Sequence, residues 1–393
     1  MRSSPVGSTP IIRNLAAAAK FAWATSTTPA LAGPRQWLTA ELPSRFRWVR
    51  SAAPGGPTLA YAGIDEGFNH ILPFLELQRG GFPVRTGGSV RWRSLVRAVP
   101  GAGPDILAVG CTARRARELP AQSSVVLPFR VHLLVSVSPD PEVRLRRVSR
   151  KERQAFVRQR ARLGWTLEEG ATRADFEEFY ERFHRPTMLT RHGEATRSLD
   201  KTTAYERVFR HGALLYVIEN GQRVAGMLCR FGPSAGEITL RLAGVMDGAE
   251  KHYRSGVFMS LYILLQEWAS DHGLFRMDLS GCEPFLSKGI FQFKRKLHPE
   301  VVLPRDHFRA KRLWLRAQRD TPAIRDFLAA NPVIAHTPRG LEAVYFHDDR
   351  RPPRLDLRWQ TPGISGCRLV DLDEFLAGLP TGDTPFMGGT ACA

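Results

Sequence analysis

The clearest alternation of apolar and polar positions lies in the middle of the chain. Residues 214–219 and 223–230 are two runs rich in β-forming side chains, and Asn220-Gly221 joins them. An Asn-Gly pair between two such runs is the strongest short signal for a β-hairpin. Residues 237–245 alternate in the same way, so this region predicts three consecutive strands.

Two segments beside these strands show helical periodicity. A helix is expected from Thr172, because Thr172 and Asp175 have the spacing of a capping box. Its apolar positions recur at intervals of three and four, which is typical of a core-facing stripe, and they are Phe176, Phe179, Tyr180 and Phe183. Residues 256–271 form a second predicted helix with Val257, Leu261, Leu264 and Trp268 on one face. Gly273 is placed to end this helix, and residues 275–279 predict a further strand.

Residues 149–163 predict a helix of a different character. Ser149 can cap its start, Glu152 has the capping-box spacing, and Gly164 can end it. Its polar face is strongly basic and carries Arg150, Lys151, Arg153, Arg158, Arg160 and Arg162. Such a face is either a solvated surface or a site for phosphate groups.

Elsewhere the pattern is weaker. Pro and Gly punctuate the first third, where residues 106–109 and 131–137 read as strands. From residue 305 the chain is expected to be a basic extension, in which Arg309, Lys311, Arg312, Arg316 and Arg319 surround Trp314. Residues 1–45 are expected to be an N-terminal arm, and residues 380–393 a disordered tail. The order of elements predicts an α+β class with mixed sheets.

Composition narrows the functional classes. The chain has 393 residues, of which 43% are hydrophobic, which is enough for two domains. Its net charge of +18 favours a polyanionic partner, although a basic soluble enzyme is the equal alternative. The five cysteines include no Cys-x-x-Cys pair, so we expect no metal site and a cytoplasmic protein. No apolar run is long enough for a membrane span.

Residues 214–297 resemble the acyl-donor half of the GNAT superfamily of N-acyltransferases. Two segments make the chain similar to the FemAB-like branch, in which two such halves are fused. One is the basic helix at 149–163, which in that branch lies between the halves. The other is the stretch 278–285 followed by the run from Gly289 to Lys296. The resemblance implies two fused GNAT-like mixed sheets with flanking helices: a degenerate half at 46–165, a donor half at 166–304 and a C-terminal extension at 305–379.

The resemblance also implies a donor site. It places a cleft near Val245 and Leu279, with the pyrophosphate of acyl-CoA held at the turn Lys251, Arg254, Ser255 and Gly256. A helix start offers free N–H groups for such a phosphate. The turn departs from the family pattern, because it has a single glycine and Phe258 stands where a small residue is usual. An ordinary capped helix start is therefore the competing interpretation.

Three residues are the candidates for catalysis. The resemblance places Lys294 opposite the donor carbonyl, where its cation stabilises the oxyanion formed on attack. Asp278 and Glu283 are the candidate bases for the amine. Each has a structural alternative: a surface lysine, a structural aspartate and a helix-capping glutamate. His184, His192, His252 and Cys282 have no spacing that marks a nucleophile, so direct attack is expected.

Three functions remain open on these grounds. The first is transfer of an acyl group from acyl-CoA to a small-molecule or peptide amine. The second, also implied by the resemblance, is aminoacyl transfer from charged tRNA, whose phosphates the basic helix would serve. The third is a nucleic-acid-binding protein without catalysis, for which no recognised motif is present. The sequence gives no indication of the oligomeric state.

Overall fold

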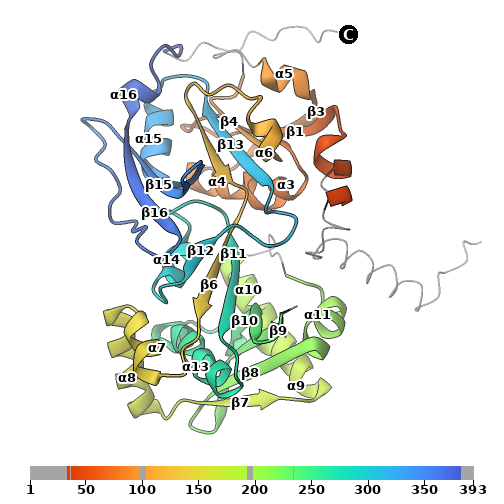
Figure 1. Cartoon of the computed structure of the whole chain (residues 1–393), viewed down its shortest axis with the longest axis vertical. Coiled ribbons are helices and arrows are strands. Elements are labelled where there is room, and N and C mark those ends of the chain that lie inside the picture. The colour runs from red at the N-terminus through yellow and green to blue at the C-terminus, as the bar shows by residue number, and fades with distance from the viewer. Residues whose placement is uncertain (1–32, 36, 98–102, 193–197, 233, 382–393) are drawn as a thin grey trace, which may run out of the picture. The chain divides into compact units, whose positions relative to one another are not determined.

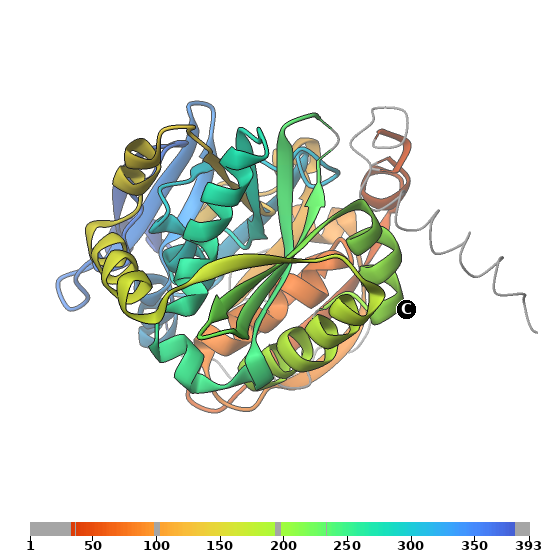
Figure 2. The ribbon, with the colours of Figure 1, turned by 90° about the horizontal axis from the view of Figure 1, so that it is seen from below.

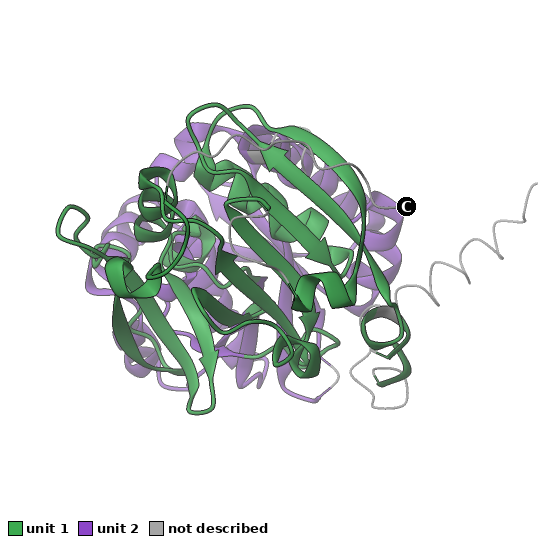
Figure 3. Cartoon of the chain, turned by 90° about the horizontal axis from the view of Figure 1, so that it is seen from above, with its two compact units in different colours: residues 1–131, 282–292, 303–393 green, residues 132–281, 293–302 purple. Residues whose placement is uncertain are grey.

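The computed structural model describes residues 33–35, 37–97, 103–192, 198–232 and 234–381 (Figure 1). The predicted arm and tail therefore lie almost wholly outside the described residues. The chain forms two compact units that do not follow the order of the sequence (Figure 3). Unit 2 consists of residues 132–281 and 293–302, and unit 1 contains everything before, between and after these segments.

Unit 2 is built on one mixed sheet of seven strands in the order β12-β6-β11-β10-β9-β8-β7. The bounds of its strands are β6 Val131–Ser136, β7 Thr166–Gly170, β8 Gly212–Glu219, β9 Gln222–Phe231, β10 Glu237–Val245, β11 Arg276–Cys282 and β12 Glu300–Val302. The predicted hairpin is confirmed, because Asn220 and Gly221 both have positive φ between β8 and β9. Strands β10 and β11 are a parallel pair, whereas β7 to β10 are antiparallel neighbours.

Helices cover both faces of the β7–β10 part of this sheet (Figure 2). The principal helices are α7 Pro141–Arg147, α8 Arg150–Leu163, α9 Arg173–Glu178, η2 Phe179–His184, α10 Arg185–His192, α11 Lys201–Arg207, α12 Glu250–Arg254 and α13 Val257–Asp271. The predicted aromatic stripe is confirmed on one face, where Phe176, Phe179 and Phe183 pack on Leu214 and Tyr216. Helix α13 lies against β7, β8 and β9 and is buried on nearly every side, more completely than the one-faced pattern predicted.

Unit 1 contains two smaller sheets. The six-stranded sheet has the order β3-β1-β2-β4-β13-β5, and the three-stranded sheet has the order β14-β15-β16. The bounds of its strands are β1 Arg45–Ala52, β2 Leu59–Gly63, β3 Val84–Arg91, β4 Ile106–Thr112, β5 Ser124–Pro128, β13 Lys311–Ala317, β14 Val333–Thr337, β15 Gly340–His347 and β16 Ile364–Asp371. Its helices include α3 Glu66–His70, α4 Leu72–Arg79, α15 Pro322–Ala330 and α16 Leu372–Phe375. Mixed sheets with flanking helices are the architecture that the sequence predicted.

The basic C-terminal extension is a wrong prediction. Residues 311–317 form β13, a strand paired on both sides within the six-stranded sheet. All seven residues are buried, including Lys311, Arg312 and Arg316. The ammonium of Lys311 donates to Glu66 at 2.7 Å, and the guanidinium of Arg312 donates to backbone carbonyls at 2.9 Å. These buried charged groups form contacts inside unit 1 and are not exposed to a partner.

The helix at 149–163 has the predicted bounds but not the predicted place. It is α8, it ends at Gly164 with φ 63°, and it lies inside unit 2. The chain passes from unit 1 to unit 2 at residues 131/132, so α8 does not link the two units. The division at residue 165 likewise does not coincide with a boundary of the compact units. The Ser149 hydroxyl makes no capping bond within the described part of the chain, and Glu152 pairs instead with Lys296 at 2.7 Å.

Candidate functional site at the fork of β10 and β11

The two parallel strands β10 and β11 separate within unit 2. Their pairing covers Glu237↔Arg276, Ile238↔Met277 and Thr239↔Asp278 and goes no further. Beyond this point β10 runs on to Val245 and β11 to Cys282, and β10 also has an irregular register against β9. The carboxyl ends of parallel strands are a common place for ligands, because backbone and side-chain groups there are not used by the sheet. We call this place the fork.

Asp278 stands at the fork and is hydrogen-bonded to a histidine. Its Oδ2 lies 2.9 Å from Nδ1 of His132 on β6, and both side chains keep about a fifth of their surface exposed. Burial is the largest influence on the pKa of Asp278 and raises it. The hydrogen bond and charge of His132, the Ser280 N–H and the charge of Lys294 outweigh it, so the pKa lies below its usual value. Asp278 is therefore an anion that orients His132, and a poor proton acceptor itself.

Lys294 is buried at the same place. It lies on α14 (Gly289–Arg295) and its residue surface is 5% exposed. Its ammonium donates to the carbonyl oxygen of Leu279 and lies 3.5 Å from that of Ser280. The interpretation of Lys294 as one more surface lysine is therefore wrong. Lys294 lies close enough to Asp278 for its charge to lower the pKa of that carboxyl group.

Ser280 holds an unusual backbone conformation between these groups. Its φ is 65°, in the left-handed region that residues other than glycine rarely adopt. Its N–H donates to Asp278 Oδ1 at 2.8 Å, and its hydroxyl donates to the carbonyl oxygen of Leu240 on β10. Such conformations cost of order 1–3 kcal/mol and cluster at functional sites. Ser280 thus fixes the point at which β11 leaves β10.

The polar residues continue across the sheet from the fork. Thr239 is opposite Asp278 on one side and opposite Arg230 of β9 on the other, and Arg230 is opposite Gly212 of β8. Directly opposite residues in paired strands present their side chains on the same face. The neighbours Ile238, Met277 and Phe231 therefore lie on the other face, where Ile238 and Met277 are buried.

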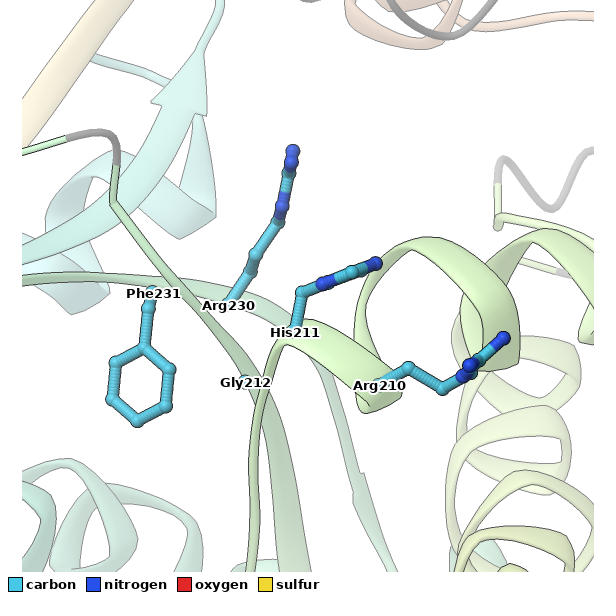
Figure 4. Close-up of a pocket in the computed structure, with 5 residues that line it drawn as sticks. All are labelled: Arg210, His211, Gly212, Arg230 and Phe231. Carbon is cyan, nitrogen blue, oxygen red and sulfur yellow. The ribbon is translucent and has the colours of Figure 1, made fainter. Parts of the chain in front are cut away.

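The end of this row borders a pocket of about 460 Å³. The pocket is lined by Arg210, His211, Gly212, Arg230 and Phe231. In Figure 4 the side chains of Arg230, His211 and Arg210 extend away from the ring of Phe231. This cationic pocket has no counterpart among the sequence predictions.

The turn before α13, which was the candidate phosphate site, offers fewer free backbone N–H groups than expected. Gly256 has φ 85° and precedes α13, and a Cβ added there would meet nothing within 4 Å. Its N–H donates to the carbonyl oxygen of Tyr253, and the next N–H, of Val257, reaches the hydroxyl of Ser255 at 3.4 Å. Gly256 is therefore required for its positive φ, while no atom of the protein itself approaches it closely enough to exclude a side chain. The exposed Arg254 lies 3.7 Å from Glu250, and Lys251 is also exposed.

Val245 and Glu283 do not join the fork site. The Val245 N–H and carbonyl are both bonded to the hydroxyl of Thr187, at 2.9 and 3.3 Å. Glu283 belongs to unit 1, is 4% exposed, and lies 3.0 Å from Lys288 and 3.5 Å from His70. Although burial raises the pKa of Glu283, His70, Lys288 and Arg130 together hold it far below its usual value. A buried, ion-paired carboxylate of this kind is a poor base.

A second basic surface lies on α7 and α8, which we call the α7–α8 face. Its exposed cations are Arg147, Arg150, Lys151, Arg158 and Arg162. None of these five forms an ion pair with a carboxylate in the described part of the chain. Two neighbours do, since Arg146 pairs with Glu142 at 2.5 Å and Arg160 with Glu267 at 2.8 Å. The uncompensated cations leave a positive field on this side of unit 2.

Within the described residues, no three His, Cys, Asp or Glu side chains gather as they would around a metal ion. The described helices likewise include none with the length and apolar character that crossing a membrane requires.

Comparison with known proteins gives structural likeness only. No protein-family model and no curated protein matches the chain. Among solved structures, FemX is similar with 12% identity and a TM-score of 0.38, over 68% of this chain and 82% of that one. L-PGS from Bacillus licheniformis is similar with 13% identity and a TM-score of 0.34, over 77% and 95%. A GCN5-related N-acetyltransferase-like protein from Streptococcus suis matches with 11% identity and a TM-score of 0.28, over 70% and 85%.

The sequence did not reveal His132, Ser280 or Arg230 as site residues. His132 stands on a predicted strand, and its partner Asp278 lies 146 residues away along the chain. The only signal was a polar residue within an apolar run, which many strands contain.

Proposed function

We propose that the chain is an N-acyltransferase that joins an activated acyl group to an amine at the fork of β10 and β11. The observation that supports it is the gathering of His132, Asp278 and Lys294 in one place. With Nδ1–H donated to Asp278, the Nε2 atom of His132 is left as a proton acceptor. Lys294 supplies a fixed cation, and an ammonium has more than one proton to donate.

The reaction follows from these roles. The amine nitrogen attacks the acyl carbonyl carbon, and its surplus proton passes to His132 Nε2. The negative charge that develops on the carbonyl oxygen is stabilised by Lys294, which is held in advance by the Leu279 carbonyl. The bond to the leaving group then breaks, and His132 returns the proton to that group. No covalent enzyme intermediate is needed: the Ser280 hydroxyl is bonded to Leu240, and Cys282 is 1% exposed.

Replacement of His132 tests this role. In His132→Asn the side-chain amide can still donate to Asp278 but cannot accept a proton, so we expect kcat to fall by about 10²–10⁴. His272→Asn is the control, because His272 is a half-exposed histidine of unit 2 at the end of α13. Transfer would be measured with labelled acetyl-CoA and labelled aminoacyl-tRNA as donors and a mixture of amines as acceptors. Equal kcat in wild type and His132→Asn, in a folded protein, rejects His132 as the base.

The first candidate donor is acyl-CoA, with its phosphates near Lys251, Arg254, Ser255 and Gly256. The second is charged tRNA, and two observations favour it. The N–H groups of Gly256 and Val257 are already used inside the turn. The α7–α8 face presents five exposed cations to a phosphate backbone. An RNA donor would therefore use a surface that acyl-CoA does not need.

The two donors are separated by the double variant Arg158→Gln/Arg162→Gln. If tRNA is the donor, affinity for aminoacyl-tRNA falls and the slope of log K against log salt decreases by about 0.7–0.9 per lost phosphate contact. Transfer from acetyl-CoA, where it occurs, is expected to be unchanged. Activity with aminoacyl-tRNA that is insensitive to both substitutions contradicts the role of the α7–α8 face.

A further inference from the structure

The cationic pocket at the end of the polar row has a definite construction. It is formed where η4 (Phe209–His211) leads into the first residue of β8, and where β9 ends at Arg230 and Phe231 (Figure 4). A Cβ at Gly212 would lie 1.9 Å from the carbonyl oxygen of Cys229, so only glycine fits opposite Arg230. The space of about 460 Å³ has the size of a small-molecule site.

The charge in this pocket is of one sign. Arg210, His211 and Arg230 line it, and the described lining includes no carboxylate. Burial, together with the neighbouring charge of Arg207, lowers the pKa of Arg230, so like charges are crowded here. Arg210 has a carboxylate beside it, since Glu206 lies 2.8 Å away and is itself partly exposed. Clustered cations favour the binding of an anion, which relieves their mutual repulsion.

The pocket also has a definite place relative to the fork. Arg230 and Asp278 are both opposite Thr239, so their side chains share one face of the unit 2 sheet. They are two strand spacings apart, which is roughly 10 Å between their backbones. A small molecule with an amine at one end and an anionic group at the other can span this distance.

We propose that the pocket of Arg210, His211 and Arg230 binds the anionic group, a phosphate or a carboxylate, of the acceptor whose amine reacts at the fork. Guanidinium groups suit this task, because their fixed N–H forks match both anions. The pocket thereby selects amphoteric amines over neutral or purely cationic ones. The claim that the bound anion belongs to an acceptor reacting at the fork rests on the proposed acyltransferase function. Anion binding by the pocket does not depend on that function.

Anion binding is tested without any transfer reaction. Inorganic phosphate and acetate are titrated into the full chain, with thermal stability and calorimetry as readouts. A ligand that binds the native state raises its stability in proportion to the logarithm of its concentration over Kd. We expect Arg230→Gln and Arg210→Gln each to weaken the binding of the preferred anion at least tenfold. The comparison of phosphate with acetate decides which anion the pocket prefers.

Arg185→Gln is the matched control. Arg185 belongs to the same unit and pairs with Glu181 four residues away at 3.2 Å, as Arg210 pairs with Glu206, and both arginines are more than half exposed. The control is expected to bind phosphate as wild type does. If neither anion binds wild type, or if Arg230→Gln and Arg210→Gln bind as well as the control, the proposal is overturned. Circular dichroism identifies a variant that fails to fold, and the other variant then decides.

The acceptor role is tested by measuring KM and kcat separately for different acceptors. Among amines that prove to be substrates, an anionic acceptor such as O-phosphoethanolamine is compared with ethanolamine. Wild type is expected to have a KM at least tenfold lower for the anionic acceptor, and Arg230→Gln to lose this preference with little change in kcat. If the pocket binds anions but no donor supports transfer, the anion-binding site is retained and the acyltransferase function is rejected. Transfer without a preference for the anionic acceptor rejects the acceptor role.

Discussion

At the scale of single residues, the fork depends on side chains that are fixed by backbone atoms. Lys294 is held by carbonyl groups of β11, and Ser280 is held by Asp278 and Leu240. A cation held in this way loses little entropy on reaction, because its position is set before the substrate arrives. Lys294 is therefore suited to act on charge that appears only in the transition state.

The variant Lys294→Ala tests this role. Since loss of one oxyanion donor costs about 10²–10³ in kcat, we expect a decrease of that size with little change in KM. Lys294→Arg is expected to restore little activity, because the planar guanidinium does not fit the space of a compact ammonium. Steady-state kinetics with an identified substrate pair measures both effects. Lys288→Ala is the control, because Lys288 pairs with Glu283 in unit 1.

The contrast between Lys294 and Glu283 shows how far sequence reasoning reached at this scale. Lys294 was chosen because a family resemblance gave it a role, and Glu283 was chosen as a candidate base that follows the strand predicted from residue 275. The structure keeps Lys294 beside Asp278 and buries Glu283 with Lys288 and His70. Residue type and spacing do not distinguish these outcomes, because the deciding partners come from distant segments. His132 was missed for the same reason.

At the scale of elements, local signals were reliable and long-range ones were not. The bounds of α8 and the β8–β9 hairpin were predicted, because Gly164 and Asn220-Gly221 act on their own backbone. The capping box Thr172–Asp175 is also confirmed. The box expected at Ser149 is absent from the described bonds, since Glu152 is taken by Lys296 from a distant segment. Likewise, β13 looked like a basic extension because its pairing partners lie far away in sequence.

The turn before α13 provides a test at this scale. Gly256 is needed for its φ of 85°, and there is room for a side chain. Gly256→Ala is therefore expected to lower the free energy of unfolding by about 1–2 kcal/mol, which is the cost of the left-handed conformation. Gly256→Asn is expected to lose less, because Asn tolerates that conformation. Urea denaturation measures both.

The same pair of variants tests the phosphate turn. If acyl-CoA binds at this turn by close approach to the backbone, both side chains raise the KM for acyl-CoA equally. If the turn has only a structural role, KM for the donor stays unchanged in both variants while stability differs. The second result would favour charged tRNA as the donor.

At the scale of the whole molecule, one cluster of ion pairs stabilises unit 1. In unit 1, the guanidinium of Arg325 on α15 contacts three carboxylates: Asp320 at 2.6 Å, Asp348 at 3.1 Å and Asp373 at 2.5 Å. Arg325→Met leaves these carboxylates without their shared cation. We expect unfolding of unit 1 to require about 2–3 kcal/mol less, as for hydrogen bonds to charged groups.

The control for Arg325 is Arg354→Met. Arg354 pairs with Asp356 at 2.8 Å, but both side chains are about half exposed. Exposed ion pairs contribute about 0–1 kcal/mol, so the change is expected to be small. Thermal unfolding of both variants would measure the difference. A similar loss in the two variants contradicts the structural importance of Arg325.

Acid sensitivity is a further property of the whole molecule. His184 is 2% exposed, and burial lowers its pKa despite the nearby Ala243 carbonyl. In the unfolded chain the imidazole of His184 binds a proton near pH 6.5, whereas in the folded protein it binds one only at lower pH. The free energy of unfolding therefore falls as pH decreases from about 6.5 toward the lower pKa of the folded state. We expect His184→Gln to show a smaller loss of stability between pH 7.5 and pH 5.5 than wild type. His252 and His336 have lowered pKa values too, so part of the loss persists.

The check is urea denaturation at both pH values, with His272→Gln as the control for a half-exposed histidine of the same unit. The control is expected to lose as much stability as wild type. An unaltered loss in His184→Gln would show that His184 is not responsible.

The organisation into units was the part that the sequence could not provide. A division into consecutive halves assumes that neighbouring segments fold together. In this chain the segments 282–292 and 303–393 return to the unit that begins with the N-terminal residues. Such returns are decided by strand pairing over long distances, which leaves no local pattern.

The position of β13 between β4 and β5 has a consequence for biosynthesis. Its pairing partner Thr112 leaves the ribosome roughly 200 residues before Lys311, which is about 10–40 s at usual rates of translation. During this interval β4, which is apolar and buried in the finished protein, has an open edge. Open apolar edges invite pairing with other chains. Nascent or truncated chains that end before residue 311 are thus the form of this protein most in need of a chaperone.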